Sequence, residues 1–248
     1  MRLEGKTAIV TGAANGFGRG IAERFAAEGA FVVVADLEGE AAERVAQGIG
    51  ARAVAVEANV AKANDVQRMV DAALAHEGRI DVLVNNAGTT HLNKPMLDVT
   101  EDEFDRIVAV NMKAIYHAAL AVVPVMGPQG GGSIITTAST AGLRPRPGLT
   151  WYNASKGWTI TATKSMAVEL APTNIRVNCL CPVAGETRML GEFMGADTPE
   201  LRAKFRATIP LGRLSTPADM ASAALWLASD EASFITGVAL EVDGGRCI

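Results

Sequence analysis

The stretch that most constrains this chain is Lys6–Ala22, with the sequence KTAIVTGAANGFGRGIA. Its apolar, β-branched run Thr7–Thr11 predicts a buried strand. Gly12, Gly16 and Gly18 follow, and the residues after them can continue as a helix. A strand, turn and helix of this kind presents free backbone N–H groups at the positive end of a helix dipole, which suits a pyrophosphate. The spacing is G-x-x-x-G-x-G rather than G-x-G-x-x-G, so the stretch alone also fits a glycine-rich turn without a ligand.

Apolar runs of strand length alternate with segments of helical length along the rest of the chain. This alternation predicts an α/β fold, a doubly wound parallel sheet of about seven strands with helices on both faces. No internal repeat or linker interrupts the pattern, so we expect residues 1–248 to form a single domain. The expected strands are Thr7–Thr11, Phe31–Ala35, Ala53–Glu57, Val82–Asn85, Ser133–Thr137, Arg176–Leu180 and Val238–Val242, and the main expected helices are Glu38–Ile49, Asn64–His76, Glu101–Val122, Trp151–Leu170 and Pro217–Leu227.

Composition argues against several classes of partner. Hydrophobic residues make up 49% and charged residues 20%, which is typical of a soluble folded chain. The net charge of −4, with no basic block, argues against nucleic acid or an anionic membrane. The first residues lack the apolar core of a signal peptide, and the longest apolar stretches are shorter than a bilayer span. Three cysteines without a disulfide framework fit a reducing cytoplasm, and three scattered histidines predict no metal site.

Asp36 closes the second expected strand. A carboxylate there can accept hydrogen bonds from both hydroxyls of an adenosine ribose, and it would repel a 2′-phosphate. An arginine at position 15 or 37 could offset this repulsion, but these positions hold Asn15 and Leu37. The glycine loop and Asp36 therefore favour NAD(H) over NADP(H), although an aspartate here can also cap the helix that begins at Glu38.

Small and polar residues also follow the third and fourth expected strands. Asn59 and Val60 come after the third, and Asn-Asn-Ala-Gly (Asn85–Gly88) ends the fourth. Ligands of open α/β sheets bind beyond the carboxyl ends of the strands, so these residues are candidate cofactor contacts. Each also fits an ordinary turn.

Tyr152 and Lys156 lie four residues apart in W-Y-N-A-S-K-G-W, and Ser139 follows the fifth expected strand. On a helix, positions i and i+4 share a face, so the ammonium lies beside the phenol. Together with the positive ring of an oxidised nicotinamide, it is expected to lower the phenol pKa from about 10. The phenol could then exchange a proton with an alcohol or carbonyl oxygen to which Ser139 donates a hydrogen bond. The pair alone would be an ordinary exposed helix pair.

Taken together, these motifs resemble the short-chain dehydrogenase/reductase family over essentially the whole chain. The resemblance implies a Rossmann-type fold, usually tetrameric, that oxidises alcohols or reduces carbonyls with a nicotinamide cofactor. It implies that Tyr152 is the acid/base, that Lys156 orients the ribose and lowers the tyrosine pKa, and that Ser139 positions the substrate. It also implies that Asn111 holds a water that links Lys156 to solvent. The motifs are Thr11–Gly18, Asn85–Gly88, Asn111 in V-N-M, Ser139, Tyr152–Lys156 and Asp243–Gly245.

The chain departs from the family pattern after the sixth strand, where it reads Pro182-Val183-Ala184-Gly185-Glu186-Thr187. Val183 replaces the usual glycine and Gly185 a larger aliphatic residue, which affects packing near the nicotinamide, while Thr187 can bond the carboxamide or pyrophosphate. The expected cofactor contacts are Gly12, Asn15, Gly16, Phe17, Gly18, Asp36, Leu37, Asn59, Val60, Asn86, Ala87, Gly88, Tyr152, Lys156, Pro182, Gly185 and Thr187.

Three loops are expected around the reacting carbon: Thr89–Val99, Thr140–Thr150 and Glu186–Phe205. The last suits a mobile lid over an apolar pocket, or equally a surface helix or dimer contact. We expect a neutral, partly apolar substrate such as a small secondary alcohol or cyclic diol. Apolar lid residues are Met189, Leu190, Phe193 and Met194, further wall candidates are His91, Leu92 and Met96, and the arginines whose contact with an anionic substrate group is left open are Arg144, Arg146 and Arg188.

The leading hypothesis is a cytoplasmic, homotetrameric, NAD-dependent enzyme that interconverts a secondary alcohol, diol or polyol and its ketone. A 3-oxoacyl-thioester reductase is the alternative, weakened by Asp36 because biosynthetic reductions usually use NADPH. A non-catalytic dinucleotide sensor or scaffold with the same fold is a third possibility. Such a protein would have little reason to retain Ser139, Tyr152 and Lys156 together.

Overall fold

Seven parallel strands form one sheet in the order β3-β2-β1-β4-β5-β6-β7. The structure is a computed structural model, and it describes every residue of the chain except Arg188. The prediction of a seven-stranded parallel sheet is confirmed, with strand bounds that differ by at most two residues. The strands are β1 (Thr7–Thr11), β2 (Phe31–Asp36), β3 (Ala53–Glu57), β4 (Val82–Asn85), β5 (Gly132–Thr137), β6 (Ile175–Pro182) and β7 (Ala239–Val242).

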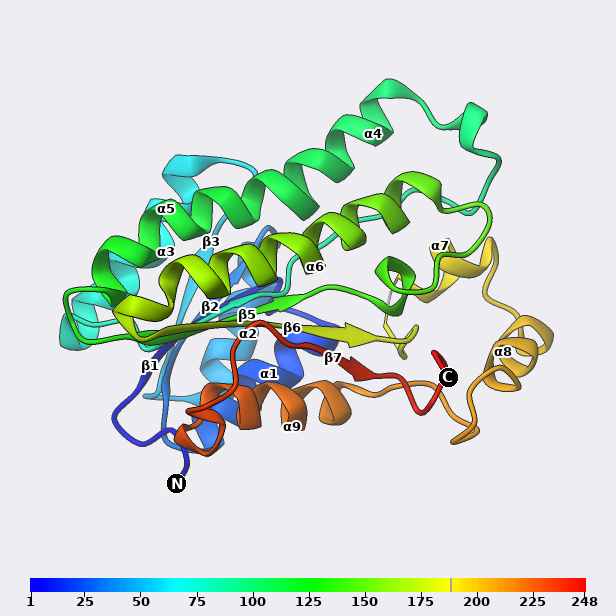
Figure 1. Ribbon diagram of the computed structural model, residues 1–248. Helices are drawn as coiled ribbons and strands as arrows, with labels where there is room; N and C mark the ends of the chain where they lie inside the picture. The colour runs from blue at the N-terminus through cyan, green and yellow to red at the C-terminus, as the bar shows by residue number, and fades with distance from the viewer. Residues whose placement is uncertain (188) are drawn as a thin grey trace.

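Helices cover both faces of this sheet (Figure 1). Helices α3, α5 and α6 lie on one face, and α1, α2 and α9 lie on the other. Their bounds are α1 (Gly16–Ala27), α2 (Gly39–Ile49), α3 (Ala63–Glu77), α4 (Glu101–Ile107), α5 (Ala114–Met126), α6 (Thr150–Leu170), α7 (Leu190–Met194), α8 (Pro199–Arg206) and α9 (Pro217–Ala228). Short 3₁₀ turns are η1 (Met96–Asp98), η3 (Thr140–Gly142), η4 (Ala171–Thr173) and η5 (Asp230–Ala232).

The core has two apolar layers, one on each face of the sheet. Side chains alternate along β1, so Ala8 and Val10 pack with the residues of α1 and α9, whereas Ile9 packs with those of α3 and α5. All five residues of β1 are buried, as expected for a central strand of a doubly wound sheet. The chain thus rigidly fixes the carboxyl end of β1, where the glycine loop begins.

The helix expected over Glu101–Val122 is interrupted by a π-helical turn, η2 (Val108–Lys113), between α4 and α5. Its start is a capping box: the Thr100 hydroxyl accepts from the Glu103 N–H, and the Glu103 carboxylate accepts from the Thr100 N–H. A π-turn adds a residue to one turn of the helix and is often found at functional sites. Here it carries Asn111, which is buried.

By length and composition, the continuous helical stretch Glu101–Met126 is apolar enough to cross a membrane. The expectation that every apolar segment is too short to span a bilayer is therefore not met when length and composition alone are considered. A core helix of a soluble protein passes the same test, and one such helix is weak evidence. In this fold the stretch packs against α3 and α6.

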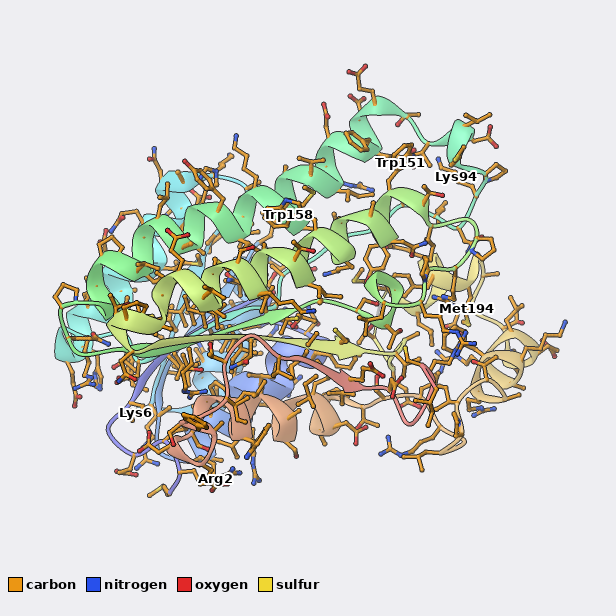
Figure 2. The ribbon with its side chains drawn as sticks, in the orientation of Figure 1. Arg2, Lys6, Lys94, Trp151, Trp158 and Met194 are labelled. Atoms are coloured by element: carbon orange, nitrogen blue, oxygen red, sulfur yellow. The ribbon has the colours of Figure 1, made fainter. Side chains whose placement is uncertain are left out.

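The glycine loop, the carboxyl ends of the strands and helices α7 and α8 gather at one end of the molecule (Figure 1). Figure 2 shows Met194 and Trp151 at this end, whereas Arg2 and Lys6 lie at the opposite end. The sheet order reverses direction between β1 and β4. Ligands of open α/β sheets bind at such a switch point, beyond the strand ends.

Candidate active site

The turn between β1 and α1 is braced by Asn86, from the end of β4. The Asn86 side-chain amide donates to the carbonyls of Thr11 at 2.9 Å and Gly12 at 3.2 Å, and its backbone N–H donates to the Thr11 hydroxyl at 3.0 Å. A Cβ at Gly18 would collide with the Gly12 carbonyl and the Asn86 amide, so this position requires glycine. Asn86 therefore stabilises the conformation of the turn. From sequence, Asn86 is only a candidate cofactor contact or part of an ordinary turn after the fourth strand.

Asp36 joins the glycine loop to the start of α2. One carboxylate oxygen accepts from the Ala14 N–H at 2.9 Å, and the other accepts from the Glu38 N–H at 3.0 Å. The carboxylate thus lies against the glycine loop and also caps the chain before α2, while its contact with a ribose stays a prediction. Leu37, beside it, is 67% exposed.

Asn59 has a local role. Its side-chain oxygen accepts from the Ala61 N–H at 3.0 Å, and its own N–H donates to the Asp65 carboxylate at 2.9 Å. These bonds shape the turn that leads into α3, as the alternative interpretation had it.

A cavity of about 240 Å³ opens at the carboxyl ends of the strands. It brings together most of the predicted site. Gly18, Asp36, Leu37, Asn59, Val60 and Asn111 are not among the described residues that line it. The predicted residues that do line it are Gly12, Asn15, Gly16, Phe17, Asn86, Ala87, Gly88, Ser139, Tyr152, Lys156, Pro182, Gly185 and Thr187.

Tyr152 and Lys156 lie on α6, as the i, i+4 spacing predicts, and each is 5% exposed. The Lys156 ammonium is 5.7 Å from the centroid of the Tyr152 ring and donates to the Thr137 carbonyl, at the end of β5, at 2.8 Å. Ser139 follows β5, and its hydroxyl accepts from the Ala141 N–H at 3.1 Å. The three side chains therefore share one wall of the cavity.

Burial changes the acidity of both α6 groups. It raises the pKa of Tyr152 to about 12, although a hydrogen bond with Ser139 and the charge of Arg146 act in the other direction. Burial also lowers the pKa of Lys156 to about 8. In the protein chain by itself the phenol pKa is therefore raised, because loss of hydration is the largest effect on both groups. The lowering expected from Lys156 together with an oxidised nicotinamide stays a prediction.

Asn111 reaches the same region from the π-turn. Its side-chain oxygen accepts from the Thr89 N–H at 2.9 Å, and its amide donates to the Thr89 carbonyl at 2.9 Å and to the Ser155 hydroxyl at 3.0 Å. A Cβ at Gly88 would lie 3.5 Å from the Asn111 oxygen and 3.6 Å from the Lys156 nitrogen. Asn111 and Lys156 thus approach each other across Gly88.

The departures from the family pattern have a packing explanation. A Cβ at Gly185 would collide with the Phe17 ring, so the bulk at this place comes from Phe17 in the glycine loop. Val183 is 4% exposed and packs with Leu190 and Leu214. A Cβ at Gly16 would lie 3.3 Å from the Thr187 methyl group, which puts Thr187 beside the glycine loop.

The segment 186–205 contributes to the cavity through some of its apolar residues. Met189, Phe193 and Phe205 line the cavity, and the Phe193 ring centroid is 5.1 Å from that of Tyr152. Leu190 instead packs beneath, in the cluster that contains Val183. The partly buried Met194 packs against the same cluster.

The other expected wall residues lie elsewhere. His91 is 1% exposed, with Nδ1 2.7 Å from the Leu92 carbonyl. Leu92 and Met96 are exposed, and none of the three is among the described residues around the cavity. Their assignment to the substrate wall is wrong because the loop after β4 turns these side chains into the core or into solvent.

Two of the three arginines left open by the sequence line the cavity, and Arg188 lies outside the described residues. Arg144 is exposed, as expected of a loop charge, but Arg146 is half-buried, with its guanidinium over the Phe205 ring. The sequence analysis missed Phe205 and Arg246, which also line the cavity. No local pattern marks Arg246, because only the fold brings it to this site.

Two groups of cysteines and acidic side chains lie near the site. Cys179 and Cys181 are free, fully buried thiols on β6, as predicted. Within the described part of the chain, ligand atoms of Glu241, Asp243 and Cys247 lie within 4.8 Å of one another. The Asp243 carboxylate accepts from the N–H groups of Gly245 and Cys247, so it is engaged in the turn of the D-G-G motif.

A parallel sheet with a glycine loop at its switch point and a buried tyrosine–lysine pair beside it has the architecture of a dinucleotide-dependent oxidoreductase. Comparison with known proteins gives the family. A family model described as enoyl-(acyl carrier protein) reductase matches residues 12–246, and the chain belongs to the short-chain dehydrogenase/reductase family.

Full-length relatives differ in the substrates for which they are named. The chain is 51% identical over 252 residues to 4-formylbenzenesulfonate dehydrogenase TsaC1/TsaC2 of Comamonas testosteroni, covering 100% of both chains. It is 37% identical to meso-2,3-butanediol dehydrogenase of Serratia marcescens, covering 99% of this chain and 96% of that one. It also resembles a crystal structure of 3-ketoacyl-(acyl-carrier-protein) reductase from Brucella melitensis complexed with NADH, with 50% identity, a TM-score of 0.94, and coverage of 99% and 100%.

Proposed function

We propose that this protein is an NAD-dependent oxidoreductase that interconverts a secondary alcohol, diol or polyol and its ketone, with Tyr152 as the general acid/base. The observation that carries the proposal is the convergence of Tyr152, Lys156 and Ser139 on one cavity whose floor is the glycine loop. The cofactor supplies hydride transfer at its nicotinamide ring.

The protein's residues fit a dinucleotide. The turn at Gly12–Gly18 aims the N-terminus of α1 at the cavity, and Gly18 keeps the backbone free of a side chain. The Asp36 carboxylate lies against this turn, where it would accept from ribose hydroxyls and disfavour a 2′-phosphate. The NADH bound to the Brucella relative supports the same cofactor here.

The catalytic residues have separate tasks in this proposal. In the reductive direction, Tyr152 gives its phenolic proton to the carbonyl oxygen, and Ser139 donates a hydrogen bond to that oxygen. A phenol with a raised pKa holds its proton at neutral pH, which suits this direction. In oxidation, Tyr152 takes the alcohol proton, and a protonated Lys156 beside it favours the tyrosinate that must form first.

A 3-oxoacyl-thioester reductase is the second candidate, favoured by the name of the Brucella relative. The decisive experiment is a spectrophotometric screen at 340 nm with NAD(H) and NADP(H), using secondary alcohols, diols, ketones and acetoacetyl-CoA. Turnover of alcohols or ketones with NAD(H) supports the proposal. Exclusive turnover of the thioester favours the alternative, and no turnover with any compound favours a non-catalytic sensor.

We also propose that the enzyme acts in the cytoplasm as a homotetramer. Large apolar side chains on α5 and α6 are exposed in the single chain, including Tyr116 at 56%, Leu120 at 59% and Val168 at 80%. Exposed apolar faces of this kind are typical of subunit interfaces. Native mass spectrometry tests the assembly, and a monomer at micromolar concentration would contradict it.

A further inference from the structure

The charged side chains around the cavity that holds Tyr152 are all basic in the part of the chain that the structure describes. Four basic residues line it, and no aspartate or glutamate is found among the described residues around it. Lys156 is engaged with Thr137 beside the reacting phenol. The other three are Arg144, Arg146 and Arg246, which accompany the lid residues.

Arg146 is held in place but has no anionic partner among the residues that the structure describes. Its carbonyl accepts from the side-chain amide of Asn153, the residue after Tyr152, at 2.7 Å. Its guanidinium carbon lies 4.8 Å from the centroid of the Phe205 ring, a cation–π contact. Its guanidinium makes no hydrogen bond or ion pair with the described residues. Burial and the charge of Arg246 lower the pKa of Arg146, which means that the surroundings disfavour the positive charge of its guanidinium. A bound anion would stabilise that charge.

Arg246 reaches the cavity because Arg144 holds the end of the chain against the η3–α6 loop. The Arg144 guanidinium donates to the carbonyls of Arg246 at 3.3 Å and Ile248 at 3.5 Å. The half-buried Arg246 side chain likewise has no acidic partner in the described part of the chain. Two like charges that share a cavity, neither of them paired with an aspartate or glutamate of the described residues, form a site for an oxyanion, which arginine binds through its fork of N–H groups.

The space between the phenol and these guanidinium groups is apolar. Phe193 packs against Tyr152, and Phe205 packs against Arg146. A substrate that extends from Tyr152 to Arg146 would therefore place a ring or short hydrocarbon against the two phenylalanines.

We propose that Arg146 and Arg246 form an anion subsite, and that the substrate is an alcohol or carbonyl compound whose apolar body ends in a carboxylate or similar oxyanion. This inference rests on the proposed function and replaces the expectation of a neutral substrate. In oxidation the carbinol carbon gives its hydride to NAD⁺ and the hydroxyl gives its proton to Tyr152, while the anionic group remains unchanged. Arg144 is a positioning residue.

Binding in a complex that cannot react tests the subsite independently of turnover. Wild-type enzyme with NAD⁺ is titrated calorimetrically with 4-acetylbenzoate and with its neutral counterpart 4-acetylbenzamide, since NAD⁺ has no hydride to give a ketone. The acid is expected to bind about ten-fold more tightly or better, as one charge-assisted pair provides. Arg146→Gln and Arg246→Gln are each expected to bring the ratio of the two Kd values close to one while leaving the amide's Kd within about two-fold.

The matched control is Arg206→Gln, which removes the same charge from an exposed position on α8 outside the cavity lining. It should keep the wild-type ratio. Equal affinity of wild-type enzyme for acid and amide, or a preference that survives both cavity substitutions, overturns the subsite. The proposed function fails separately, if the turnover screen finds no alcohol or ketone that reacts with NAD(H).

Discussion

The Lys156 ammonium donates a hydrogen bond to the Thr137 carbonyl at 2.8 Å and so joins α6 to the end of β5. Ser139 lies two residues beyond this carbonyl, and Tyr152 lies one helical turn before Lys156. One hydrogen bond therefore fixes the position of both elements that carry the proposed chemistry.

Replacing Tyr152 with phenylalanine should remove turnover and keep NAD binding. The ring still packs against Phe193, but the proton carrier is lost, so kcat should fall by about 10²–10⁴-fold or more. Tyr116→Phe is the matched control, because Tyr116 is the other of the two tyrosines in the chain and is exposed. Steady-state rates and NADH fluorescence titrations give the two readouts, and a near-wild-type kcat would refute the role of the phenol.

Asp36→Ala should weaken the preference for NAD over NADP. The substitution removes the carboxylate that accepts from the ribose and repels a 2′-phosphate, so the ratio of kcat/KM values for the two cofactors should fall by about ten-fold or more. The ratio serves as its own control, since loss of the bonds to Ala14 and Glu38 affects both cofactors alike. An unchanged ratio would contradict the ribose assignment.

Lys156→Met should make the stability of the cofactor-free protein less dependent on pH between 8 and 10. Burial lowers the folded-state pKa of Lys156 to about 8, below its ordinary value, so the charged lysine destabilises the fold at pH 7. Wild-type stability should rise as the pH rises from 8 towards the ordinary lysine pKa, whereas the variant, which has also lost the bond to the Thr137 carbonyl, should not show this rise. Each pKa unit corresponds to about 1.4 kcal/mol, so the pH-dependent part of the free energy of unfolding is about 3 kcal/mol. This corresponds to several degrees in Tm.

Melting curves of both proteins at pH 7 and pH 10 measure this effect. Burial raises the folded-state pKa of Tyr152 to about 12, so the phenol stabilises the fold below its ordinary pKa, and that contribution is lost only at higher pH. Tyr152 therefore does not titrate up to pH 10, and the shifted thiols of Cys181 and Cys247 are present in both proteins, so the difference between the two melting curves reports on Lys156. A Tm difference that does not change with pH would show that the ammonium is not desolvated.

Most of the sheet could be predicted from sequence because its central strands are buried on both faces. Five consecutive apolar or β-branched residues such as Thr7–Thr11 have few alternatives to a central strand. The π-turn at Asn111 was not predictable in this way, since its residues continue an ordinary helical pattern and only the packed fold distinguishes it. Spacing gave Tyr152 and Lys156 a common face, but their pKa shifts depend on burial by distant segments.

The substrate end was the least predictable part of the site. The lid composition suggested an apolar wall, and Phe193 is part of it, but the direction of each side chain in so short a helix depends on the partner surface. Leu190 packs on Val183 instead. Arg246 comes from the far end of the chain, where the D-G-G turn and Arg144 place it. A sequence pattern cannot specify such a contact between distant segments.

Gly185→Ala should destabilise the protein through Phe17. The new methyl group would collide with the Phe17 ring, at an expected cost of about 1–3 kcal/mol, because over-packing forces neighbouring groups out of their preferred positions.

A second variant tests whether Phe17 is the cause. Phe17→Ala alone removes the ring and leaves a gap. In the double variant the methyl group enters space that the ring has left and still meets the Ser215 hydroxyl, so the two costs should add only in part. Urea denaturation of the four proteins in this cycle gives the interaction energy, which should favour the double variant by about 0.5–3 kcal/mol. Strict additivity would mean that the Phe17 ring does not occupy the space beside Gly185, and the glycine would then need another explanation.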